Sequence, residues 1–264
     1  MRPLGWGRGG RLDRLVVCMD AARQIRSSVE AVSRLRQAAG SDPALAAGIT
    51  AVKRLQSRRF AGTYADLLRS GPHAAAARFF LDELYSDKDY AERDAQFARI
   101  AGAIEKLFPA QVAQTAVALA QLHALTEELD QAMGSAWAQR QLGADAGAAY
   151  VACWREVGRR DDRTRQLEVV LEVGDEMVRL TRTRALGTML RMMRGPASAA
   201  GLASLQRFLE SGFDTFAAMA RQRGSAEAFL GTIAQRESAL IELLFDAELV
   251  ACETQLRSTL GQAP

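Results

Sequence analysis

The sequence has few of the residues that build cross-linked, metal-bound or membrane-spanning proteins. It contains 3 cysteines and 2 histidines in 264 residues, and Cys18, Cys153 and Cys252 are far apart with no CxxC pair. This spacing indicates neither a disulfide framework nor a zinc site, so a reducing cytoplasm is the expected location. The apolar run at residues 15–19 is too short for a signal peptide or a spanning helix. We therefore expect a cytoplasmic protein without membrane association.

Lysine is also scarce, since Lys53, Lys88 and Lys106 are the only ones. Nearly all basic charge is therefore arginine, as a GC-rich genome would produce. The formal net charge of +3 gives no global argument for binding to nucleic acid or to an anionic membrane.

Standard catalytic motifs are missing from the sequence. There is no GxSxG elbow, no Gly-Lys-Ser/Thr phosphate loop, no His-Glu-x-x-His pair and no Cys–His arrangement of a known spacing. Their absence weighs against an enzyme without deciding the question. No cofactor and no metal are predicted.

Proline is rare, with 6 residues, and alanine is abundant, a balance that favours helix. Apolar residues recur at helical spacing, and no stretch alternates as a strand would. The sequence predicts an all-α bundle of roughly eight to ten helices. Residues 1–10, which hold four glycines, are expected to be a flexible tail, and residues 11–264 a single helical domain. The alternatives are a subdomain boundary near 143–147, or two helical layers that share a central apolar helix at 198–220.

Helix ends are marked clearly at several points. Asp42 followed by Pro43 predicts a helix start, and the Ser-Gly-Pro sequence at 70–72 predicts a break. Asp89 with Glu92 three residues later predicts a capping box at the start of another helix.

Two segments resemble a known protein family. Residues 79–94 read FFLDELYSDKDYAERD, and residues 201–213 read GLASLQRFLESGF. Both are similar to an uncharacterised family of proteobacterial all-helical proteins with an FFLxxLY(G/S)xxD(F/Y)xxRD signature; Ser86 occupies the position where glycine is frequent. The resemblance implies a bacterial, cytoplasmic, all-helical protein and no particular catalytic activity.

Asp94 is polar but lies on an apolar helix face, four residues after Tyr90 and three before Phe97. A buried carboxylate needs a partner, because otherwise it stays protonated. One hypothesis is a structural ion pair with a nearby arginine, and the other is a ligand-binding or catalytic carboxylate. The arginines considered as partners are Arg58, Arg59, Arg69, Arg78 and Arg93.

Four more polar residues border apolar stripes. His123 and Glu127 share a helix face and could supply two metal ligands, but a di-iron bundle needs two Glu-x-x-His pairs, which this chain lacks. Gln206 lies between Leu202 and Leu209, and Glu237 follows Ile233. Each alone is typical of a hydrogen-bonded core residue. Together they give a hypothesis of one polar pocket, lined by Asp94, His123, Glu127, Gln206 and Glu237, with Tyr64, Tyr85 or Tyr90 nearby.

A second candidate region is basic. Five arginines occur within sixteen residues without an intervening acid, interleaved with methionines. They predict either a surface for an acidic partner or nucleic acid, or a solvated face of an amphipathic helix. These arginines are Arg179, Arg182, Arg184, Arg191 and Arg194.

Three hypotheses for the function follow. The leading one is a non-catalytic helical scaffold or binding protein that acts through protein–protein contacts or self-association. The alternative is a helical small-molecule-binding protein or enzyme with a buried polar pocket. The second alternative is binding of nucleic acid or of an acidic partner through the 179–194 arginine face, although the low net charge disfavours nucleic acid. A polar cavity that joins the pocket residues would favour the small-molecule hypothesis.

Overall fold

The computed structural model describes residues 20–140 and 145–263, and the regular structure in these residues is helical. The predicted all-α fold is confirmed, although the helical segments slightly outnumber the eight to ten expected because several are short. They are α2 (Ala21–Gly40), α3 (Pro43–Thr63), α4 (Ala65–Arg69), α5 (Ala74–Glu83), α6 (Ala91–Leu107), α7 (Ala110–Ala138), α8 (Ala146–Val157), α9 (Arg160–Thr181), α10 (Arg184–Met192), α11 (Arg194–Ala199), α12 (Ala203–Ala220), α13 (Ser225–Asp246) and α14 (Leu249–Gly261).

Of the two helix starts predicted from capping residues, one has the expected hydrogen bonds and the other does not. Asp42 caps α3 as predicted, accepting hydrogen bonds from the backbone amides of Ala44 (3.0 Å) and Leu45 (3.1 Å). The capping box at Asp89 does not form. Asp89 accepts from the Ala91 amide at 2.9 Å, but Glu92 instead accepts from the Gln96 side chain at 2.7 Å.

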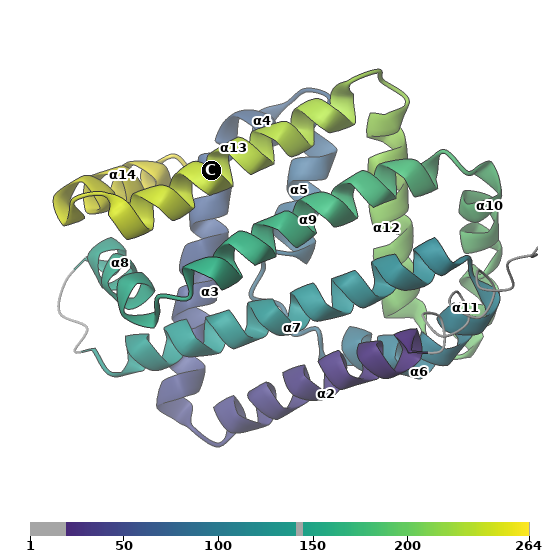
Figure 1. Cartoon of the computed structure of the whole chain (residues 1–264), viewed down its shortest axis with the longest axis horizontal. Helices are drawn as coiled ribbons and strands as arrows, with labels where there is room; N and C mark the ends of the chain where they lie inside the picture. Colours follow the sequence, from purple (N-terminus) through teal and green to yellow (C-terminus); the bar gives the residue numbers. More distant parts are fainter. Residues whose placement is uncertain (1–19, 141–144, 264) are drawn as a thin grey trace, which may run out of the picture.

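The helices form two crossing layers (Figure 1). Helices α2, α7, α9 and α13 lie side by side in the front layer, while α3, α5 and α12 cross behind them. The crossing of α3 and α7 is very close, because a Cβ on Gly48 would lie 2.3 Å from the carbonyl oxygen of Gly134. These two glycines therefore set how near the layers approach at that point.

Helix α12 is covered on most sides, as expected for a central helix. It contacts α5, α6, α9, α10, α11 and α13, and only one narrow face is open to solvent. Arg207, Ser211 and Asp214 recur on that face at helical spacing and are exposed, whereas Phe213, Phe216 and Met219 are buried. The exposed polar stripe is therefore the one uncovered face of this largely buried helix.

Two further expectations concern the chain ends and its middle. The predicted tail at 1–10 and residues 143 and 144 of the predicted boundary lie outside the described residues. Asp145 starts α8 by accepting from the Gly147 amide at 2.9 Å. None of the helices in the described part of the chain is long and apolar enough to cross a bilayer.

Candidate ligand-binding cavity

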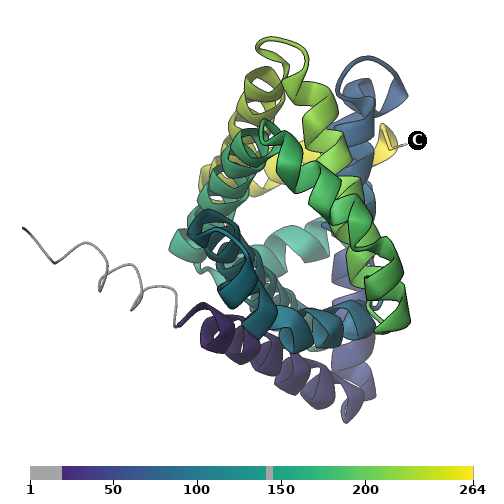
Figure 2. The ribbon, with the colours of Figure 1, turned by 90° about the vertical axis from the view of Figure 1, so that its right-hand side faces the viewer.

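The two layers enclose a cavity of about 470 Å³. Seen from the right-hand side of Figure 1, the helix ribbons are arranged in a ring, with α8 crossing behind it (Figure 2). Residues from α2, α3, α5, α6, α7, α8, α9, α10, α11, α12 and α13 line the cavity. Its volume lies in the range of about 300–1,000 Å³ that is usual for small-ligand sites.

Helix α7 presents one continuous face to the cavity. The lining positions recur every three or four residues, so they form a stripe along the helix. The stripe is apolar where α7 begins, at Val112, Ala116 and Leu119, and ionisable further on, at Glu127 and Asp130. The side chains on α7 therefore change from apolar to polar along the cavity.

Helix α9 lies beside α7 and runs in the opposite direction (Figure 1). Its lining side chains therefore change from polar to apolar along the sequence, whereas those of α7 change from apolar to polar. Arg163 and Gln166 line the cavity near the start of α9, and Val170, Met177 and Leu180 line it further on. The polar parts of both helices thus meet at the same end of the cavity. This polar end lies toward α8, and the apolar end lies toward α10.

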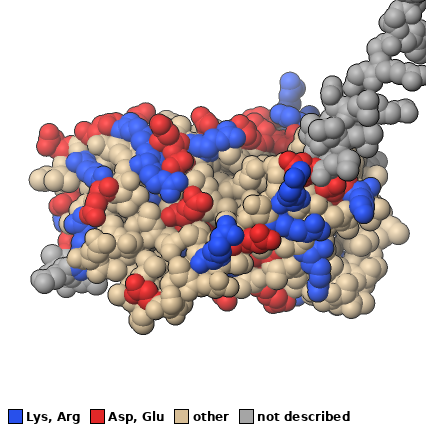
Figure 3. All heavy atoms as spheres, turned by 60° about the horizontal axis from the view of Figure 1, so that its bottom comes forward, with Lys and Arg blue, Asp and Glu red and all other residues tan. Residues whose placement is uncertain are grey.

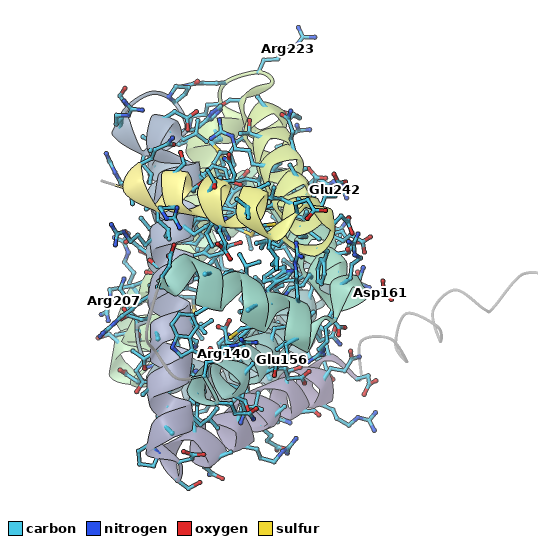
Figure 4. The ribbon with its side chains drawn as sticks, turned by 90° about the vertical axis from the view of Figure 1, so that its left-hand side faces the viewer. Arg140, Glu156, Asp161, Arg207, Arg223 and Glu242 are labelled. Atoms are coloured by element: carbon cyan, nitrogen blue, oxygen red, sulfur yellow. The ribbon has the colours of Figure 1, made fainter. Side chains whose placement is uncertain are left out.

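The apolar end is open and the polar end is closed. Leu107 is 77% exposed and Met193 is 43% exposed, and both line the cavity, so they mark its mouth beside α10. At the other end the lining residues Tyr150 and Trp154, on α8, are buried. Figure 4 shows α8 and α14 covering this end of the molecule, with the exposed pair Arg140 and Glu156 beside them.

Arg59 and Glu237 form a fully buried ion pair in the cavity wall. Arg59 Nη1 donates to Glu237 Oε1 at 2.6 Å, and the Tyr64 hydroxyl donates to the same oxygen at 2.9 Å. Burial alone would lower the pKa of the Arg59 guanidinium, but Glu237 and the neighbouring tyrosines raise it above its ordinary value. Burial, and then Glu237, also raise the pKa of Tyr64. The pair ties α3 to α13.

Lys53, Glu127 and Asp130 form a second polar group. Lys53 Nζ lies 2.6 Å from Glu127 Oε1 and 3.8 Å from Asp130 Oδ2. Burial raises the pKa of Asp130 to about 6, because the stabilising charges of Lys53 and Arg163 only partly offset the loss of solvation. Asp130 is 3% exposed, so its negative charge is poorly stabilised in the folded protein.

Asp94 is held by two partners from different helices. Its Oδ2 accepts from Arg36 Nη2 at 2.7 Å and lies 2.9 Å from His123 Nε2. Burial would raise the pKa of Asp94, but the hydrogen bond and charge of His123, together with Arg36, lower it. The expected ion pair is therefore present, but its arginine is Arg36 on α2. None of the five arginines considered from the sequence is the partner, because α2 and not a neighbouring segment packs against α6 here.

Arg163 is equally buried but has an incomplete set of partners. It is 5% exposed, and its Nε and Nη2 have no hydrogen-bond partner among the described residues. Its guanidinium carbon lies 4.2 Å from the centre of the Trp154 ring, and Trp154 Nε1 also lacks a partner in the described part of the chain. The left-handed backbone at Gly158 (φ 63°) and Arg159 (φ 59°) turns α8 into α9 and brings these side chains together.

The structure brings all five predicted pocket residues to one cavity, along with Tyr85 and Tyr90. Gln206 donates to the Leu190 carbonyl at 2.6 Å and to Glu210 at 2.8 Å, so it is already paired. Among the described residues no three His, Cys, Asp or Glu side chains are placed to hold a metal ion.

Sequence reasoning did not assign several charged residues to the cavity, among them Arg59, Asp130 and Arg163. Each lies on an apolar helix face by spacing alone. Arg59 follows Leu55 by four residues, and Asp130 precedes Met133 by three. Arg163 precedes Leu167 by four residues, but it occurs in a run of charged residues that obscures this spacing.

The predicted arginine surface has several acidic partners. Arg179 pairs with Glu176 at 3.0 Å, Arg191 with Asp214 at 2.9 Å and Arg194 with Glu210 at 2.7 Å. Arg182 is exposed, and the side chain of Arg184 lies outside the described atoms. On the face drawn in Figure 3, basic and acidic side chains are interspersed. The local charge of the 179–194 segment is therefore largely balanced by neighbouring acids.

Comparison with known proteins places the chain in one family. A family model described as a domain of unknown function, DUF8198, matches residues 35–250. The chain belongs to this family. This agrees with the expectation of a family that has no established activity. No curated protein and no solved structure shows a significant match to the chain.

Proposed function

We propose that this DUF8198 protein binds a small, largely apolar molecule in the cavity between its helical layers. The observation that carries the proposal is the cavity itself, about 470 Å³ in volume, with apolar walls toward an open mouth and a few ionisable groups at the closed end. Concave, mainly apolar sites with a small number of placed polar groups are typical of ligand-binding proteins. This function was the alternative to a non-catalytic scaffold in the sequence analysis.

Binding is favoured over catalysis because most ionisable groups of the cavity are paired with one another. Asp94 is held by Arg36 and His123, Glu127 by Lys53, and Glu237 by Arg59. Such pairs shape the walls and leave few groups available to transfer a proton. The proposal therefore assigns these residues to the architecture of the site.

We also propose a location and a mode of interaction for the protein. A bacterial, cytoplasmic protein is consistent with the composition, and a protein partner or self-association would use exposed side chains such as Met192 or Val250, which are 73% and 76% exposed. We also propose that the described part of residues 11–264 forms one domain, since both halves of the chain line the cavity.

A cavity-filling variant tests the proposed function. Leu119 lines the cavity from the middle of α7, so Leu119→Trp should fill part of it. Gln114→Trp is the matched control, because Gln114 is an exposed residue on the same helix. The probe is Nile red, a neutral apolar dye whose fluorescence rises on leaving water.

We expect saturable Nile red binding to the wild-type protein and to Gln114→Trp, and binding weakened about tenfold or more, close to 1.4 kcal/mol or above, in Leu119→Trp. Circular dichroism would check that both variants are folded. Absence of saturable binding to the wild-type protein, or equal binding by two folded variants, would contradict a ligand site in this cavity.

A further inference from the structure

The closed end of the cavity carries hydrogen-bond donors without acceptors. The donors are Nε and Nη2 of Arg163 and Nε1 of Trp154, on residues that are 5% and 6% exposed. Both residues line the cavity. Buried donors are normally paired, since an unpaired one costs about 1–3 kcal/mol. These donors therefore indicate a ligand group that accepts hydrogen bonds.

The geometry of the free donors indicates which chemical group of a ligand could accept their hydrogen bonds. Nε and Nη2 lie on the same edge of a guanidinium, the edge that binds two coplanar oxygens of one carboxylate. The Arg163 guanidinium lies over the Trp154 ring, with its carbon 4.2 Å from the ring centre. This contact limits the freedom of the arginine and keeps its free edge in place.

The local charge balance favours a single negative charge on the ligand. At this end Lys53 is paired with Glu127 and Arg59 with Glu237, so their charges cancel. Arg163 makes no ion pair with any described residue within hydrogen-bonding range, although Asp130 acts on it electrostatically. Asp130 offsets the charge of Arg163, so the formal charges at this end cancel. A dianionic phosphate group would add two negative charges beside Glu127 and Asp130, whereas a carboxylate adds only one.

The remaining walls indicate what is attached to the charged group. From the closed end toward the mouth, α7 and α9 present apolar side chains such as Leu119 and Val170, and the mouth is formed by Leu107 and Met193. The lining positions on α7 extend from Asp130 to Val112, a helical rise of about 27 Å. An extended apolar chain suits this shape better than a compact polar molecule.

We propose that the ligand is an amphipathic monocarboxylate. Its carboxylate binds the free edge of Arg163 and the indole N–H of Trp154, and its apolar chain extends toward the mouth beside α10. This assignment rests on the proposed function, since it names the ligand class of the same cavity.

The first experiment compares dodecanoate with dodecanol, which has the same chain and no charge. Isothermal titration calorimetry would measure both ligands against the wild-type protein, Arg163→Gln and Arg165→Gln. Arg165 is the matched control, because it is an exposed arginine on the same helix that pairs with Glu168 and Glu172. Charge-assisted hydrogen bonds predict that the wild-type protein prefers dodecanoate by about tenfold to a hundredfold.

We expect Arg163→Gln to lose this preference while still binding dodecanol, and Arg165→Gln to keep it. Equal affinity of the wild-type protein for the two ligands, or a preference for dodecanol, would overturn the carboxylate assignment while leaving the cavity as a binding site. Retention of the preference in Arg163→Gln would overturn the role of Arg163. If neither ligand binds, the assignment fails, and the Nile red titration decides separately whether the proposed function fails with it. The wild-type comparison stands even if Arg163→Gln does not fold.

The second experiment tests the orientation of the ligand through the fluorescence of Trp154, which bromine quenches at short range. Dodecanoate brominated beside its carboxylate should quench more strongly than dodecanoate brominated at its terminal carbon, and Trp154→Phe should remove the difference. Stronger quenching by the terminal bromine would reverse the proposed orientation.

Discussion

Arg59 and Arg163 are two buried arginines in one cavity wall, and their surroundings differ. They are 6% and 5% exposed, and each lies against an aromatic ring. Arg59 has an acidic partner at 2.6 Å, whereas Nε and Nη2 of Arg163 have none in the described residues. The difference shows that burial alone does not define the role of a charged residue. A complete set of partners is typical of a structural group, and an incomplete set leaves a group available to a ligand.

The largest effect is expected when the complete pair is broken. Glu237→Gln leaves the Arg59 cation buried without a counter-charge, and it weakens the acceptor of Tyr64. Breaking a buried ion pair typically costs about 3–5 kcal/mol. We expect the free energy of unfolding, measured by urea denaturation, to fall by about 3 kcal/mol or more. A loss below about 1 kcal/mol would show that the pair does not stabilise the wall.

Asp130 lines the same cavity as the two arginines and should give a pH-dependent effect. Its pKa is raised from 3.8 to about 6 in the folded protein, so the folded state favours the protonated form. The corresponding stability is fully present below about pH 4 and is lost as the pH rises through about 6. Two pKa units correspond to about 3 kcal/mol.

The variant Asp130→Asn cannot ionise and should escape this loss. We therefore expect its stability relative to the wild-type protein to increase by up to about 3 kcal/mol between pH 4 and pH 7. Urea denaturation of both proteins at several pH values measures this difference in stability. The contributions of the other titrating groups are the same in both proteins and largely cancel. If the difference in stability between the two proteins did not change with pH, ionisation of Asp130 would not destabilise the folded protein.

Asp94 should show the opposite pH dependence. Its pKa is lowered, so its stabilising contribution is present above the unfolded pKa and is lost as the pH falls through the folded value. Asp94→Asn leaves Arg36 and His123 without their carboxylate, and we expect a loss of about 2 kcal/mol at neutral pH that shrinks in acid. The control is Asp214→Asn, which breaks the exposed pair with Arg191 and should cost about 0.5 kcal/mol. Equal losses in the two variants would remove the distinction between buried and exposed pairs.

Features that depend on local interactions could be predicted from the sequence. The cap at Asp42 and the helix break at 70–72 depend on residues within a few positions of each other, and both are found where predicted. Spacing also indicated which face of its helix Asp94 occupies. It could not indicate Arg36 as the partner, because the two residues are 58 positions apart and meet only through the packing of α2 against α6.

The cavity could not be predicted from helical periodicity for a similar reason. An apolar stripe such as that of α7 looks the same whether the facing helices fill the space or leave it open. The volume depends on how α7, α9 and α13 pack together. Arg163 was hidden by its neighbours, since Arg159, Arg160 and Asp162 made its segment resemble a solvated helix start. Its position four residues before Leu167 was the one available signal.

The smallest effect on stability is expected at Arg163. Because its Nε and Nη2 have no protein acceptor among the described residues, Arg163→Gln removes a costly buried charge together with the stacking on Trp154. The stacking is worth about 0.5–2 kcal/mol, which the relief of the buried charge offsets. We expect the free energy of unfolding without ligand to change by less than about 1 kcal/mol, in contrast to Glu237→Gln. A loss as large as that of Glu237→Gln would place Arg163 among the structural groups and would remove the difference between the two arginines.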